Sequence, residues 1–293
     1  MSPHPNPLPS GEGTTFQALS VPGDPLRHPN EDAWAANPAR GAFAVCDGVT
    51  ASFLADGSYP PWAGGGKAAW LAAAALAAAP PGPPRGALAA ALATADRLVG
   101  SLNAARDDGP IDFREHDTFN TTAVAAIVEA GRATIAMLGD AAALLQPSSG
   151  AARLLTRFQT TAAERLRDEI LREGGMSEAE RVALFRRELR NRVEPWHGHA
   201  GIGFGVLDGT GRFGPLVEWV EVELAPGDRL YLASDATGWA LNALAEAGQP
   251  LPTAPAEVLA YARRWEHDTN ARYRDDLTVL IVEPDATRHA RPR

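Results

Sequence analysis

Two short segments, Arg27-His-Pro-Asn-Glu-Asp32 and Ala44-Val-Cys-Asp47-Gly48, decide the fold of this chain. Asp47 ends an apolar run and is followed by glycine, a pattern typical of a strand that delivers a carboxylate to the edge of a sheet before a sharp turn. Asp32 lies fifteen residues earlier. Because carboxylates at a sheet edge commonly hold hard metal ions, this stretch indicates a metal site.

Three further aspartates, Asp140, Asp235 and Asp275, stand beside other apolar runs. Together with Asp47 they suggest that several strand ends converge on one rim, where like charges would be unstable without cations. Oxygen-only ligands with no histidine nearby in the sequence favour magnesium or manganese over zinc. The alternative, four solvated aspartates in separate turns, stays open on spacing alone.

Composition narrows the class of protein. The chain of 293 residues is long enough to bury a full core, and its 36 acidic against 27 basic residues give a net charge of −9. That balance argues against nucleic-acid binding and is compatible with an acidic metal site. The single cysteine, Cys46, excludes an internal disulfide and a thiolate zinc site, and we expect it to be a small buried hydrophobe.

No targeting segment is recognisable. Residues 1–13 lack the basic start and apolar core of a signal peptide, and the apolar run 68–79 is shorter than the ~20 residues that span a bilayer. We therefore expect a soluble, cytoplasmic protein that does not bind membranes. By composition, residues 1–13 are a disordered leader, residues 14–284 form one domain and residues 285–293 are a C-terminal tail.

The apolar runs predict strands toward both ends of the chain with helices between them, which fits a layered α+β domain better than alternating βαβ units. Runs at 121–128, 132–137 and 142–146 suggest an antiparallel meander, and 201–207 with 211–216 suggest a hairpin across Asp208-Gly209. The remaining strands are expected at 15–20, 41–47, 217–224, 229–234 and 277–282, and helices at 62–79, 86–105, 239–247 and 255–270. The proline-rich segment 80–84, between the first two helices, is expected to be non-helical.

A further helical pair is predicted over residues 153–192. This segment carries ten arginines against seven acidic residues, although the chain as a whole is acidic. A locally basic element can steer an anionic partner toward a site. The alternative is a solvated amphipathic pair whose charges serve solubility.

Six segments, taken together and in order, resemble the metal-dependent serine/threonine protein phosphatases of type 2C, especially the bacterial members. Each segment is a weak signal alone, but the ordered set at these separations is specific, and it covers residues 14 to about 282. The segments are Arg27-x-x-Asn30-Glu31-Asp32, Phe43-Ala-Val-Cys-Asp47-Gly48, Thr121-Thr122-Ala123, Leu138-Gly139-Asp140, Leu232-Ala-Ser-Asp235 and Asp275-Asp276-Leu277-Thr278-Val279.

The resemblance implies a four-layer α-β-β-α sandwich of two antiparallel sheets flanked by helix pairs, with two manganese or magnesium ions at one edge. It implies that Asp47 bridges both ions and that the Gly48 carbonyl binds one of them. Asp235 and Asp275 would hold the other ion. Asp140 would serve a weaker third ion.

The resemblance also assigns the catalytic residues. Asp32 would orient a metal-bound water, and Arg27 would clamp the substrate phosphate. The physical logic agrees, because two cations make hydroxide available near neutral pH and neutralise charge on the phosphoryl oxygens. A guanidinium presents a planar fork to two of those oxygens.

Three positions depart from the usual pattern of the family. Val49 follows Asp47-Gly48 where histidine or methionine is common, Ala236 replaces the glycine after Asp235, and Ala141 replaces the serine after Asp140. None of these changes removes a metal ligand. They leave the chain without a histidine ready to protonate the leaving group.

The sequence thus predicts a bacterial signalling phosphatase acting on phosphoserine and phosphothreonine. The expected partner is a phosphoprotein, for example the product of a serine/threonine kinase, and the expected oligomeric state is a monomer. Two alternatives are kept. The chain could be a degenerate member that binds a phosphoprotein without turnover, or a hydrolase of small phosphate esters on the same scaffold.

Overall fold

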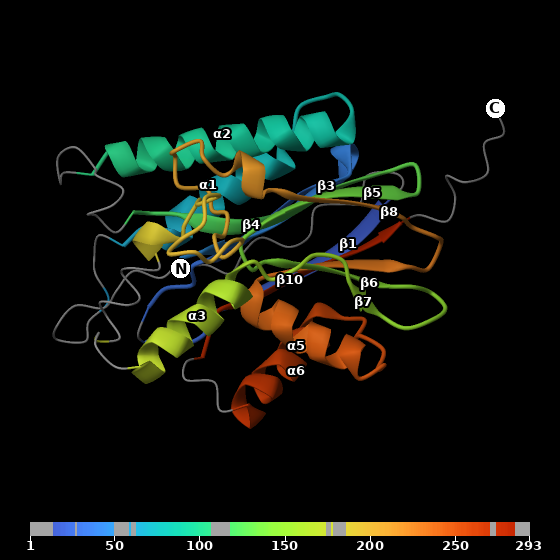
Figure 1. Ribbon diagram of the computed structural model, residues 1–293. Coiled ribbons are helices and arrows are strands. Elements are labelled where there is room, and N and C mark those ends of the chain that lie inside the picture. The colour runs from blue at the N-terminus through green and yellow to red at the C-terminus, as the bar shows by residue number, and fades with distance from the viewer. Residues whose placement is uncertain are drawn as a thin grey trace.

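The computed structural model describes residues 14–26, 28–49, 59, 63–106, 118–173, 177, 186–269 and 274–284, with 171–173 as backbone only. Within these residues two five-stranded antiparallel sheets stack face to face (Figure 1). In spatial order the first sheet contains β2 (Asp32–Asn37), β3 (Ala42–Gly48), β4 (Thr121–Glu129), β5 (Arg132–Leu138) and β8 (Glu218–Glu223). The second contains β1 (Thr14–Val21), β10 (Leu277–Pro284), β9 (Arg229–Ala233), β6 (Ala142–Gln146) and β7 (Arg153–Leu154).

Helices cover the outer faces of both sheets. The pair α1 (Gly65–Ala77) and α2 (Pro84–Ala104) packs on the first sheet, and the pair α5 (Asp235–Glu246) and α6 (Pro255–Asp268) packs on the second (Figure 1). A further helix, α3 (Thr160–Glu173), packs through Ala163 and Leu166 against Leu189 and Ile202. Short 3-10 turns, η1 (Pro38–Arg40) and η2 (Gly214–Leu216), complete the described elements. The expected α+β sandwich is confirmed.

Large side chains fill the space between the two sheets. Phe43 and Val45 of β3 point inward with Ile135 of β5, and they meet Leu232 of β9 and Leu280 of β10. All five are fully buried. Because full burial of one such side chain stabilises a fold by about 1.5–3 kcal/mol, this inner layer is the main source of hydrophobic stabilisation.

Small side chains line the opposite face of the first sheet. Along β3, Ala42, Ala44 and Cys46 alternate with the inward-pointing residues, and they contact alanines of α1 and α2. Cys46 is fully buried, as expected. Alternation along the strand sends successive side chains to opposite faces, so one run of sequence serves two cores. Small residues on this face let the helices lie close to the sheet.

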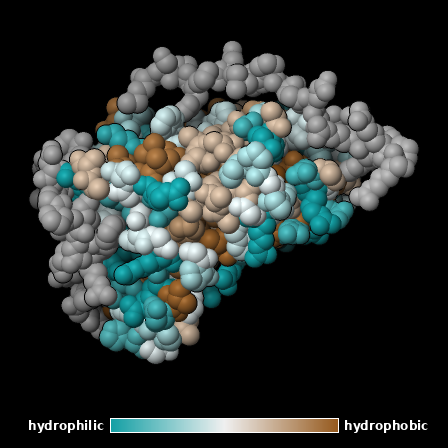
Figure 2. Space-filling view, turned by 90° about the horizontal axis from the view of Figure 1, so that it is seen from above, coloured by the Kyte–Doolittle hydropathy of each residue, from teal (hydrophilic) through white to brown (hydrophobic). Residues whose placement is uncertain are grey.

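The outer surface of the α1 and α2 layer is mixed in character. Seen from above, hydrophobic patches are small and separated by pale or hydrophilic residues (Figure 2). This pattern is typical of a solvated helix layer. No helix of the described residues combines the length and apolar character needed to cross a bilayer.

The structure differs from the sequence predictions at several places, including residues 153–154, which form β7 and not the start of a helix. Pro84 is not part of a non-helical hinge but the first residue of α2, a position where its missing N–H costs nothing. Strand β2 was not predicted from the sequence, since its alanine-rich sequence lacks β-branched residues. Strand β6 pairs with β9 and β7, so the run from β4 through β6 is no meander. Segments 201–207 and 211–216 form no hairpin.

The turn that replaces this hairpin is held by a distant carboxylate. Asp96 of α2 accepts hydrogen bonds from the backbone N–H groups of Asp208 (3.0 Å), Gly209 (2.9 Å) and Gly211 (2.9 Å). These bonds satisfy buried donors that strand pairing would otherwise need to satisfy. The turn is therefore hydrogen-bonded to α2 and does not connect two paired strands.

The chain crosses between the sheets at Gly139, directly after β5. Gly139 has a φ of +80°, and a Cβ atom there would lie 2.4 Å from Cγ2 of Thr122. Its N–H donates to Oε1 of Gln159 (3.0 Å), and its carbonyl accepts the Gln159 N–H (2.9 Å). Glycine is required here both by the left-handed backbone and by the close contact.

We expect Gly139→Ala to lower the free energy of unfolding by about 2–4 kcal/mol, because backbone strain and a steric clash add together. Gly248→Ala is the matched control, since Gly248 has a φ of +66° but open space around it. That variant should lose only about 1 kcal/mol. Urea unfolding of both proteins measures the difference, and equal losses would refute the steric role of Thr122.

Candidate metal centre

Five aspartates from both sheets lie at one edge of the sandwich. In the first sheet, Asp32 at the start of β2 is the direct partner of Asp47 at the end of β3. Directly opposite residues in antiparallel strands project to the same face, so these two carboxylates are neighbours. Asp47 interacts electrostatically with each of the other four, Asp32, Asp140, Asp235 and Asp275. Asp235 and Asp275 also interact with each other. All five therefore form a single group, here called the acidic cluster.

The register of the second sheet explains the convergence of the other three. Strand β9 runs antiparallel to both β6 and β10, with Ala233 opposite Ala142 and Val279. The end of β9 therefore lies beside the starts of β6 and β10. Asp140 precedes β6, Asp235 follows β9 and Asp275 precedes β10, so all three reach the same edge.

Close packing at Gly48 fixes the end of β3. Its N–H donates to the Glu31 carbonyl (3.1 Å), and a Cβ atom would lie 2.3 Å from the backbone of Gly65 in the first turn of α1. Thr121 fastens the same strand end, since its Oγ1 donates to the Asp47 carbonyl (2.7 Å). Glycine at 48 is thus required by the approach of α1.

Asp275 and Asp276 have different surroundings although they are neighbours. Asp276 is buried, and its two carboxylate oxygens accept the N–H groups of Gly23 (2.7 Å) and Glu31 (2.6 Å). Asp275 is exposed. Both oxygens of Asp276 are engaged by backbone donors, whereas Asp275 accepts one such bond, from the Asp276 N–H (2.9 Å). The choice of Asp275 as metal ligand stays a prediction.

Helix α6 positions the segment that carries Asp275. The guanidinium of Arg263 donates to the Asp275 carbonyl (2.5 Å) and to the Pro22 carbonyl (2.9 Å). Glu266 accepts the Asp275 N–H (3.1 Å) and pairs with Arg263 (2.7 Å). Neither residue belongs to a motif identified in the sequence, and their role depends on a contact that only the folded chain creates.

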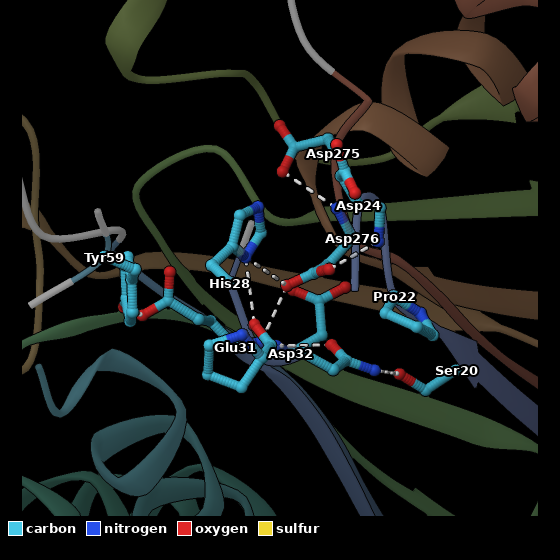
Figure 3. Close-up of polar contacts among 12 residues, drawn as sticks. Ser20, Pro22, Asp24, His28, Glu31, Asp32, Tyr59, Asp275 and Asp276 are labelled. Carbon is cyan, nitrogen blue, oxygen red and sulfur yellow. Dashed lines mark hydrogen bonds and ion pairs between the residues drawn. The ribbon is translucent and has the colours of Figure 1, made fainter. Parts of the chain in front are cut away.

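A polar network joins the start of β2 to the start of β10 (Figure 3). His28 Nδ1 lies 2.9 Å from the Pro29 carbonyl and 4.0 Å from a carboxylate oxygen of Asp276. The hydroxyl of Tyr59 donates to the buried carboxylate of Glu31. The sequence motif contains His28 and Glu31, but nothing in the sequence indicated their links to Asp276 and Tyr59.

Burial and mutual repulsion raise the pKa values of the clustered carboxyls. Desolvation is the larger cause for Asp47, whose pKa is raised further by Asp235 and Asp32. The pKa of Asp235 is raised by desolvation and then by Asp275. For Asp32 the causes are desolvation and then Asp276, opposed by the hydroxyls of Ser234 and Thr278.

The pKa values of Asp140 and Asp275 are raised less than those of Asp32, Asp47 and Asp235. The pKa of Asp140 is raised to about 6, first by desolvation and then by Glu164. The pKa of Asp275 is also raised to about 6, by desolvation and then by Asp276 and Glu266, against a lowering by the Asp276 N–H. Because Asp275 is exposed, bulk water opposes its desolvation, and we attribute its shift mainly to the neighbouring acids.

The donor set fits a hard divalent cation by its chemistry. It consists of carboxylate oxygens that repel one another, and Oδ2 of Asp32 is buried without a hydrogen-bond partner among the described residues. Among the same residues, no group of three or more acidic, histidine or cysteine side chains is placed closely enough to hold a metal ion as the side chains stand. Arg27, the predicted phosphate clamp, lies outside the described residues.

Comparisons with known proteins identify the fold. No protein-family profile and no curated protein sequence matches this chain. The catalytic domain of the serine/threonine protein phosphatase PstP, solved in complex with two manganese ions, matches with a TM-score of 0.61 and 20% identity over 93% of this chain and 99% of that one. Serine/threonine phosphatase Stp1 from Staphylococcus aureus matches with a TM-score of 0.58 and 15% identity over 96% and 98%.

The serine/threonine phosphatase PstP/Ppp of Mycobacterium tuberculosis gives a TM-score of 0.60 at 20% identity, over 93% of this chain and 99% of that one. Nearly the whole of each structure is therefore shared with this chain. The expected resemblance to type 2C phosphatases is confirmed at the level of the fold.

Because Asp275 and Asp276 differ in burial and in hydrogen-bond partners, we expect substitution of one to affect manganese binding and substitution of the other to affect stability. Asp276→Ala should lower the free energy of unfolding by about 2–4 kcal/mol, because two buried N–H groups lose their acceptor. Asp275→Ala should not lower the stability of the metal-free protein, because it removes a repelling charge, but it should weaken manganese binding. Urea unfolding and calorimetric titration with manganese measure the two effects, and a reversed order of the variants would overturn the assignment.

The raised pKa values predict how pH affects the metal-free protein. An aspartate with a folded pKa of about 6 and an ordinary value of 3.8 holds its proton longer in the folded state, so its contribution to stability falls as pH rises from about 4 to 6. In chelator, the double variant Asp140→Asn/Asp275→Asn should lose less stability than wild type over this window. Glu257→Gln, on the exposed surface of α6, is the control. Parallel pH profiles for wild type and the double variant would exclude repulsion in the acidic cluster.

Proposed function

We propose that this protein is a metal-dependent phosphatase that hydrolyses phosphoserine and phosphothreonine monoesters of proteins. The observation that carries the proposal is the acidic cluster. Five aspartates at strand ends and turns of two sheets converge at one edge of a sandwich shared with structures described as serine/threonine phosphatases. The resemblance of the ordered sequence segments supports the same activity.

The resemblance to type 2C phosphatases supports a role for each metal ligand. Asp47 would help to hold both of two manganese or magnesium ions, and the Gly48 carbonyl would help to hold one of them. Asp235 and Asp275 would hold the other, and Asp140 a weaker third. When bound, such ions supply a water of lowered pKa and neutralise the charge that develops on the phosphoryl oxygens.

The protein's own side chains would orient the reactants. The buried Oδ2 of Asp32 has no partner among the described residues, so it can accept a hydrogen bond from the attacking water. Arg27 would bind two phosphate oxygens in its planar fork. Asp276 supports this arrangement, because it accepts N–H groups on both sides of Arg27, from Gly23 and Glu31.

The wider setting of this activity is also a proposal. The likeness to bacterial phosphatases supports a signalling enzyme, acting as a monomer in the cytoplasm on products of a serine/threonine kinase. Retention of every predicted carboxylate favours an enzyme over a module that only binds.

We expect manganese-dependent hydrolysis of a generic aryl phosphate that is lost in chelator and restored by added manganese. Asp47→Asn should lower kcat/KM by at least about 100-fold, because it removes charge where the ions would be shared. Glu257→Gln, on the exposed surface of α6, should behave as wild type. Circular dichroism and urea unfolding check that both variants are folded.

Phosphopeptides then separate the substrate classes. A kcat/KM for phosphoserine or phosphothreonine peptides well above that for small esters would support a protein phosphatase. Activity that is unchanged in chelator, or full activity of Asp47→Asn, would refute the metal-dependent mechanism.

A further inference from the structure

A cavity of about 700 Å³ lies between the segments 187–194 and 208–215, and none of the clustered aspartates lines it. Four arginines and three acidic residues contribute to its walls. They are Arg187, Arg190, Arg192, Arg212, Glu188, Glu194 and Asp208. We call this space the arginine cavity.

Two of the three acidic residues are already paired with arginines. Asp208 lies 3.6 Å from Arg190, and both side chains are at most 5% exposed. Glu188 lies 3.2 Å from Arg192. These pairs cancel charge inside the wall, so the net positive charge of the cavity comes from its remaining arginines.

Arg187 and Arg212 are these remaining arginines. They come from opposite walls, both are exposed, and neither forms an ion pair with any residue in the described ranges. Glu194 is the one unpaired acid of the lining and is exposed as well. Two arginines that line one cavity are suited to a carboxylate or a phosphate, because each guanidinium offers a fork of N–H donors.

Hydrogen bonds hold both walls in place. The amide of Asn191 pairs with the backbone of Val206 in both directions, at 3.0 and 2.9 Å. On the other wall, Asp208 accepts the N–H of Thr210 (2.9 Å), and Asp96 holds the same turn from α2. A cavity with walls fixed in this way loses less entropy when it binds a ligand.

The arginine cavity is connected to the acidic cluster through few residues. Leu207, directly before Asp208, exchanges backbone hydrogen bonds with Thr121 at 2.9 and 3.2 Å. Thr121 in turn donates to the Asp47 carbonyl (2.7 Å). An extended peptide covers about 3.3 Å per residue, so a few residues of it span a separation of the order that these contacts give.

We propose that the arginine cavity binds a second anionic group of the phosphoprotein substrate, an acidic side chain or another phosphate a few residues from the target phosphoserine. This inference rests on the proposed function and names its substrate class. The structure narrows the predicted recognition role of residues 153–192. Arg187 is exposed and is suited to this role. Arg190 is not, because its buried guanidinium already pairs with Asp208. Reversal of Arg190 to glutamate would also place two buried acids side by side.

The test compares the double variant Arg187→Gln/Arg212→Gln with wild type. The control is Arg97→Gln/Arg153→Gln, which removes the same charge from exposed positions of α2 and β7 outside the cavity lining. Three phosphoserine peptides are used, identical except for flanking asparagines, flanking aspartates or a second phosphoserine. Fluorescence anisotropy in chelator at physiological salt measures binding, and manganese assays measure kcat and KM.

We expect the cavity variant to bind the aspartate and doubly phosphorylated peptides about fivefold to tenfold more weakly than wild type, as loss of two charged contacts predicts. Its KM for these peptides should rise by the same factor with kcat unchanged. Binding of the asparagine peptide and turnover of an aryl phosphate should match wild type, and the control should match wild type throughout. A loss for only one anionic peptide identifies that group as the ligand.

Equal binding of the three peptides by wild type, or equal losses in the cavity and control variants, would overturn the proposal. Absence of phosphatase activity in every protein would instead refute the proposed function. The binding measurements in chelator do not depend on activity, so the two failures are distinguishable.

Discussion

Repulsion among carboxylates held at one edge of two sheets is the constraint on which this structure depends. Desolvation and neighbouring acids raise the pKa values of Asp32, Asp47 and Asp235 together, so the folded chain concentrates negative charge where burial opposes it. A protein tolerates such a group when the rest of the fold is strongly stabilised or when cations neutralise the charge. The buried layer between the sheets provides the first condition, and the proposed ions provide the second.

The two faces of the first sheet show how the fold brings the cluster together. Large residues such as Phe43 and Ile135 join the sheets, and alanines on the other face admit α1 closely. That approach brings the first turn of α1 onto Gly48, at the end of the strand that carries Asp47. Packing on both faces of β3 thus positions a carboxylate that neither face stabilises by itself.

Charge is divided between two places in this molecule. The acidic cluster suits cations, whereas the arginine cavity suits an anion, and a route through Leu207 and Thr121 connects them. A phosphoprotein carries its target phosphate and neighbouring acidic groups on one flexible chain. An overall charge of −9 would repel such a substrate, so a local positive site is useful for orientation as well as affinity.

The sequence alone determined the features that depend on local pattern: aspartates at strand ends, strands of alternating side chains, two alanine-rich helices and an ordered set of segments typical of one fold. Tertiary structure decided which sheet each strand joins, because β6 has the same local pattern whether it pairs with β5 or with β9. Tertiary structure also decided that Asp208-Gly209 forms no hairpin turn, because Asp96, 112 residues away, accepts hydrogen bonds from the N–H groups of this segment. Burial and long-range partners also decide the pairing of Arg190 with Asp208 and the different hydrogen bonding of Asp275 and Asp276. Local sequence does not specify these partners.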